Sequence, residues 1–82
     1  MLSLFKQQVK TIEELNLESI AWKIGIHHEC VEVYCDARET VMEALSELED
    51  LQLNVASTGR WLSGSIIHEN TLVKFVVYLQ FN

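Results

Sequence analysis

Proline is absent from this sequence, glycine occurs three times in 82 residues, and no run is rich in serine or glycine. Linkers between domains are commonly built from these residues, so we predict a single domain over residues 1–82. A chain of this length buries only roughly 60% of its unfolded surface. Its hydrophobic fraction of 49% is high for that size, which favours leftover apolar surface for a partner or a second copy.

Basic residues are also scarce, with six lysines and arginines against twelve acidic residues and a net charge of -6. The six are scattered, whereas phosphate contacts need clustered lysine and arginine. We therefore expect no direct contact with nucleic acid. No run of 18 apolar residues exists, and the start MLSLFKQQVK lacks the apolar centre of a signal peptide. An intracellular protein without membrane contact is the expectation.

Chemistry-bearing residues are few. Cys30 and Cys35 lie five apart in a predicted strand and so point to opposite faces; we expect unpaired, partly buried thiols. His27, His28 and His68 do not provide the paired ligand spacing of zinc sites. Cys35 precedes a predicted helix, but no base or oxyanion donor set stands out near it. We predict no catalytic activity, no metal and no cofactor.

Residues 29–55 form the organising stretch, which reads as strand, turn, helix and strand. The strand places Val31, Val33 and Cys35 on one face. Asp36 is the expected helix cap. The helix is predicted over residues 38–50. Its apolar face towards the sheet contains Val41, Leu45 and Leu48. Its acidic residues towards water are Glu43, Glu47, Glu49 and Asp50.

Flanking segments complete a sheet. Alternation over residues 20–26 predicts a strand that forms a hairpin with the next one. A strand is expected from residue 53 to about residue 61, followed by a loop or bulge over residues 62–70 near Gly59 and Gly64. The longest strand signal covers residues 71–81, with one wholly apolar face for the core. This core face is predicted to be Val73, Phe75, Val77, Leu79 and Phe81. The second, mixed face, which includes Val76 and Tyr78, could be covered by another subunit.

The N-terminal segment 2–15 has apolar residues in a 3-4-3 spacing, typical of an amphipathic helix. It packs either on its own sheet or against a partner helix. Trp22 is expected in the core, whereas Trp61, beside Arg60 and near glycines, is the better interface anchor. The candidate association interface is Phe5, Val9, Ile12, Trp61, Val76 and Tyr78.

The order of elements resembles a known family. The hairpin IAWKIGIHHECVEVYC, the segment TVMEALSELEDLQLNV and the closing VKFVVYLQ are similar to the ACT-like domain of plant basic helix-loop-helix transcription factors. The opening FKQQVKTIEEL is similar to the end of the second helix in such proteins. The resemblance covers most of the chain, from residue 20 to residue 81, and is one of pattern.

This resemblance implies a small α+β fold of ferredoxin-like or ACT-like type. A βαβ-based antiparallel or mixed sheet of about four strands would pack on one main helix over residues 20–82, with an N-terminal helix over residues 1–16. It implies a nuclear, regulatory dimerisation domain that pairs with itself or a similar domain. Amino-acid-binding ACT domains have a glycine in the loop between first strand and helix, whereas residues 35–38 contain none, so no small-molecule ligand is expected. Residues 62–70 are short for a second helix.

The leading hypothesis is therefore a non-catalytic protein–protein interaction module, a dimerisation domain of a transcription factor. The alternative is a free-standing, cytoplasmic, small acidic binding or inhibitor protein that covers a basic surface of its partner. That alternative rests on the charge of -6 and on the acidic helix face.

Overall fold

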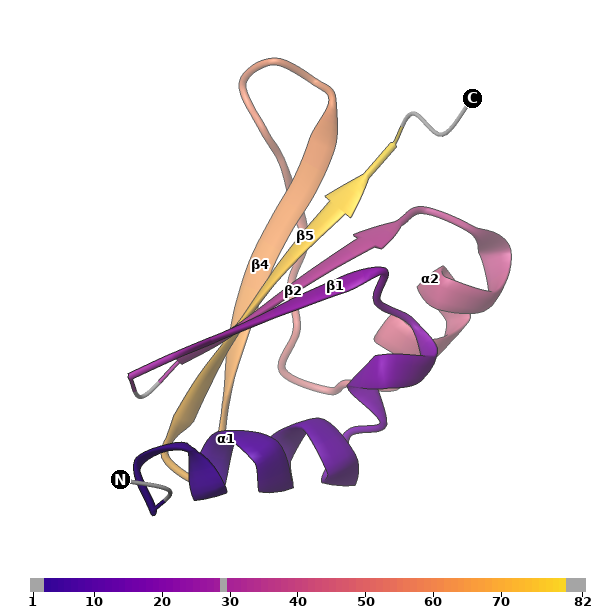
Figure 1. Cartoon of the computed structure of the whole chain (residues 1–82). Helices are drawn as coiled ribbons and strands as arrows, with labels where there is room; N and C mark the ends of the chain where they lie inside the picture. The colour runs from indigo at the N-terminus through magenta and orange to yellow at the C-terminus, as the bar shows by residue number, and fades with distance from the viewer. Residues whose placement is uncertain (1–2, 29, 80–82) are drawn as a thin grey trace.

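The computed structural model describes residues 3–28 and 30–79 and contains a five-stranded mixed sheet with two α-helices (Figure 1). The elements in chain order are α1 (Ser3–Glu14), the 3-10 turn η1 (Leu17–Ser19), β1 (Lys23–His27), β2 (Cys30–Asp36), α2 (Glu39–Ser46), β3 (Asn54–Val55), β4 (Trp61–His68) and β5 (Thr71–Tyr78). The α+β class and the mixed sheet are confirmed, but the sheet has five strands rather than about four. No helix in the described ranges has the length and apolarity to cross a membrane.

The sheet is centred on the parallel pair β2 and β5, in the strand order β1-β2-β5-β4-β3. Each strand contributes three inward-pointing residues, which pair in register with those of the other strand. All six of these residues are at most 1% exposed. The predicted core faces of these two strands are therefore confirmed for these six residues. Leu79, predicted on the core face of the last strand, follows the end of β5 and is 39% exposed, so that part of the prediction is wrong. Phe81 lies outside the described residues. The register pairs are Val31 with Val73, Val33 with Phe75, and Cys35 with Val77.

Both helices cover this same inner face (Figure 1). Ile12 and Leu17 reach it from α1 and η1, while Val41 and Leu45 reach it from α2. Covering one face of a mixed sheet leaves the other face free of helices. The fold thus has two layers with one uncovered surface.

Helix α1 is rotated away from the predicted apolar seam. Among residues 5–14 of this helix, the buried side chains are Gln8, Thr11 and Ile12, whereas Phe5 and Val9 are 43% and 44% exposed. Gln8 is held inside because its amide Nε2 donates a hydrogen bond of 2.9 Å to the carbonyl of His27. The helix therefore packs on its own sheet, and Phe5 and Val9 of the predicted apolar face remain exposed to solvent. Leu2, the first residue of that face, is not among the described residues.

Helix α2 begins later and ends earlier than predicted. Asp36 is the last residue of β2, where it pairs with Tyr78, so it is not the helix cap. The cap position is Arg38, whose backbone is extended and whose side chain makes no capping bond. The parallel ladder continues through Ala37, whose N–H donates to the Tyr78 carbonyl at 2.8 Å. Asp36, which the sequence pattern assigned to the helix cap, therefore belongs to the strand because it pairs with β5.

Residues 62–70 were predicted as a loop or bulge, but residues 62–68 belong to the strand β4, which begins at Trp61. Gly64 was interpreted as a chain breaker, but it lies inside the strand, opposite Phe75. A Cβ at this position would collide with the carbonyl oxygen of Gln52 and lie 3.1 Å from Cδ1 of Leu51. The residue is therefore explained by close approach of another backbone segment.

A tight turn joins β4 to β5. Glu69 and Asn70 both have positive φ, 45° and 70°, as in the two-residue turns that match the twist of a hairpin. The ferredoxin-like order βαββαβ has a helix before its last strand, whereas this turn occupies that place. Strand β3 is only two residues long and pairs with the start of β4.

We expect Gly64→Ala to destabilise the fold by about 1–3 kcal/mol, because the added methyl group overpacks the contact with Gln52. Without that contact the substitution would stabilise slightly, since alanine restricts the unfolded chain, so the sign of the change is diagnostic. Urea unfolding followed by circular dichroism measures it. Ser65→Ala, on the exposed side of the same strand, is the control, and a Gly64→Ala variant as stable as the parent would contradict the packing argument.

Candidate interaction surface

A row of four aromatic side chains crosses the uncovered face of the sheet. Trp22 precedes β1, Tyr34 lies on β2, Tyr78 on β5 and Trp61 on β4. The ring centroids of Trp22 lie 6.0 Å from Tyr34 and 5.8 Å from Tyr78, and Trp61 lies 6.3 Å from Tyr78. These separations are typical of interacting rings, so the row is one continuous surface.

Strand alternation places these rings outside. Val33, Cys35 and Val77 point into the core, and successive strand residues point to opposite faces, so Tyr34 and Tyr78 point outward. Trp22 was predicted to be in the core, and that prediction is wrong. Strand β1 begins at Lys23, after Trp22, whose indole is 58% exposed beside the two tyrosines.

Charges balance on this surface, which we call the open face. By register, Lys23 and Lys74 lie on it together with Glu32 and Asp36, two charges of each sign. The Lys23 ammonium lies 5.4 Å from the centroid of the Tyr34 ring. The open face is therefore close to neutral although the chain carries a net charge of -6. Its apolar and aromatic residues are Trp22, Tyr34, Trp61, Ile67, Leu72, Val76 and Tyr78.

The structure separates the residues proposed for association into three places. Trp61, Val76 and Tyr78 lie together on the open face. Phe5 and Val9 lie on the exposed side of α1, in the other layer. Ile12 is 7% exposed and belongs to the core, so it is not available to a partner. Sequence reasoning missed Trp22 and Tyr34, although the alternation that exposes Tyr78 also exposes Tyr34.

Cys35 and His27 have ordinary structural surroundings. Cys35 is fully buried, and burial, with a smaller effect of Asp36, raises its pKa to about 11. Its thiol is therefore protonated at neutral pH and packs as an apolar group. His27 on β1 contacts Glu32 on β2, with 2.8 Å between Nε2 and Oε1.

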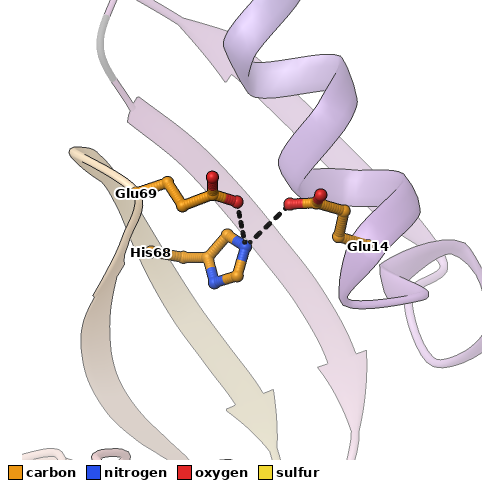
Figure 2. A group of neighbouring side chains, drawn as sticks. All are labelled: Glu14, His68 and Glu69. Carbon is orange, nitrogen blue, oxygen red and sulfur yellow. Dashed lines mark hydrogen bonds and ion pairs between the residues drawn. The ribbon is translucent and has the colours of Figure 1, made fainter.

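A cluster that the sequence did not predict joins α1 to the β4–β5 turn (Figure 2). Nε2 of His68 lies 2.9 Å from Oε1 of Glu14 and 3.1 Å from Oε2 of Glu69. Lys10 approaches both carboxylates, at 4.0 Å from Glu14 and 3.5 Å from Glu69. Glu14 and His68 are 54 residues apart in the chain, so no local pattern signals their contact.

One imidazole nitrogen and two carboxylate oxygens within 4.8 Å of one another are a donor set that a divalent metal accepts. Here the two carboxylates already have partners within the chain, the imidazole of His68 and the ammonium of Lys10. We therefore interpret the cluster as an ion-pair clamp between helix and turn. The pKa of the Glu14 carboxyl is lowered, chiefly by its hydrogen bond with His68 and further by Glu69 and Lys10.

Comparison of the chain with models of protein families, with curated proteins and with solved structures gives no match.

The lowered pKa of Glu14 predicts a pH-dependent contribution to stability. Because the folded-state pKa lies below the ordinary value of 4.5, the contribution is complete above that pH and is lost as the pH falls through the lowered value. Glu14→Gln should lower the melting temperature at about pH 6 and should lower it by less at about pH 3, because the contribution decreases once the pH falls below the ordinary value. The control is Glu13→Gln, exposed on the same helix. Equal melting temperatures of parent and Glu14→Gln at both pH values would contradict the clamp.

Proposed function

We propose that this chain is a protein–protein association module that forms a dimer through the open face. The observation that carries the proposal is the aromatic row of Trp22, Tyr34, Tyr78 and Trp61. Tryptophan and tyrosine are the residues most enriched at the energetic centres of interfaces. Val76 and Leu72 extend the same apolar surface along β5.

Area and charge support a second copy as the partner. A standard interface buries about 800 Å² per partner, about a seventh of the 5754 Å² that the chain exposes. One uncovered face of a five-stranded sheet is a surface of that order. Two copies of a chain with net charge -6 repel each other in general, but the open face has two charges of each sign and removes that penalty at the contact.

The resemblance to the ACT-like domain of plant basic helix-loop-helix transcription factors leads to the same proposal and adds a context. In that context the module pairs with itself or with a similar domain, regulates transcription in the nucleus and has no catalytic role. The aromatic row supports the association, and the regulatory context rests on the resemblance.

The proposal predicts concentration-dependent dimerisation in analytical ultracentrifugation. Both tryptophans of the chain lie on the open face, so their fluorescence should shift to shorter wavelength over the same concentration range as water leaves the rings. Trp22→Ser should raise the dimer dissociation constant by more than about tenfold, as expected for an interface anchor. Val76→Lys should act similarly by burying an unpaired charge.

Phe5→Ser and Val9→Ser are matched controls, because both remove half-exposed apolar side chains from α1 without touching the sheet. Each should leave the dimer dissociation constant unchanged. Circular dichroism of every variant checks that the fold is retained. A parent chain that sediments only as a monomer at high micromolar concentration would refute the proposal, and dissociation caused by the α1 variants would move the interface to that helix.

A further inference from the structure

The helix layer, on the side of the sheet opposite the open face, contains a groove. One hollow of about 370 Å³ lies between the end of α1, η1 and α2, and a second of about 220 Å³ continues from α2 to β4. The two hollows share three lining residues, Leu15, Glu47 and Leu48. The two hollows therefore adjoin each other, and we call the pair the acidic groove.

Apolar side chains form the inner part of this groove. Leu15, Ile20 and Leu48 line it and pack against the core, yet each remains partly exposed. Ile66 of β4 lines the second hollow in the same way. An apolar side chain of a partner that entered here would contact the rim of the core and lose its own water.

Acidic side chains form the rim, and no lysine or arginine is among the residues that line either hollow. Glu14 lies at one end, while Glu47, Glu49 and Asp50 follow α2. Across residues 3–28 and 30–79, none of these last three carboxylates forms an ion pair within 4.0 Å. Glu14 is paired with His68, which also lines the second hollow, and with Lys10. The negative charge of Glu47, Glu49 and Asp50 is therefore the part of the rim that has no partner within the described residues.

The negative potential of the rim is increased by its position at the C-terminal end of α2. Helix α2 ends at Ser46 and has no basic residue in its last turn, although cations stabilise a helix C-terminus and anions do not. Glu47, Glu49 and Asp50 thus add to the negative end of the helix dipole. A cation supplied from outside would gain from both sources.

We propose that the acidic groove binds a basic segment of a partner protein, with an apolar side chain seated on Leu15 and Leu48 and lysine or arginine residues on the rim. Charge complementarity argues for this occupant. A second copy, nucleic acid or an anionic membrane surface would each bring negative charge to a negative rim. The proposal concerns a surface separate from the open face and does not depend on dimerisation.

The test uses the full chain and a short fluorescein-labelled peptide of alternating arginine and leucine, with binding followed by fluorescence anisotropy. Triple neutralisation of the rim, Glu47→Gln with Glu49→Gln and Asp50→Asn, should weaken binding by roughly tenfold, as expected for three exposed ion pairs. The matched control removes the same number of charges outside the groove, by Glu13→Gln with Glu39→Gln and Glu43→Gln. It should weaken binding by less than about threefold through long-range charge alone.

A second peptide, of alternating arginine and serine, tests the apolar part and should bind more weakly than the arginine–leucine peptide. Equal weakening by the two triple variants, equal binding of the two peptides, or absence of binding at low salt would each overturn the proposal. Analytical ultracentrifugation of the triple rim variant tests dimerisation separately from peptide binding. Neutralising the groove should leave the dimer dissociation constant within about threefold of the parent value, because the groove and the open face are separate surfaces.

Discussion

The parallel pairing of β2 with β5 is the constraint on which the structure depends. Parallel strands need a crossover connection, because a tight turn can join only antiparallel neighbours. The chain between them supplies α2, which covers one face of the sheet, and the strands β3 and β4, which extend it. The three buried register pairs that join the two strands, such as Val33 with Phe75, fix this arrangement, because a shift of one residue would expose every apolar side chain.

The same constraint produces the difference between the two faces. Both α1 and α2 lie on the inner side, so no helix within residues 3–28 and 30–79 covers the outer side. Four aromatic side chains nevertheless form a row on this outer side, three from the strands β2, β5 and β4 and one from Trp22, directly before β1. Most of the acidic residues lie instead in the helix layer, on α1, η1 and α2 or directly after α2: Glu13, Glu14, Glu18, Glu39, Glu43, Glu47, Glu49 and Asp50. The sequence thus separates an apolar, neutral surface from a charged one.

Alternation was enough to predict the faces of β2 and β5, since burial inside one chain imposes a strict period of two. It failed where contacts distant in sequence decided the outcome. Gln8 is buried because the His27 carbonyl accepts its hydrogen bond, so the apolar seam did not set the orientation of α1. Gly64 indicates a loop by composition, yet the approach of Gln52 explains it. On the open face, Trp61, Val76 and Tyr78 were predictable from position, whereas the exposure of Trp22 depends on where β1 begins.

The two surfaces have a geometric relation that follows from the two-layer fold. If two copies meet through their open faces, both helix layers lie outside and the two acidic grooves point away from each other. One dimer would then offer two equivalent sites for basic segments, and a partner with two such segments on a linker of matching length would bind more tightly than either segment alone. Weak individual contacts, such as exposed ion pairs, could in this way produce strong association. A monomer would lack that gain, so dimerisation itself would control the affinity for a bivalent partner.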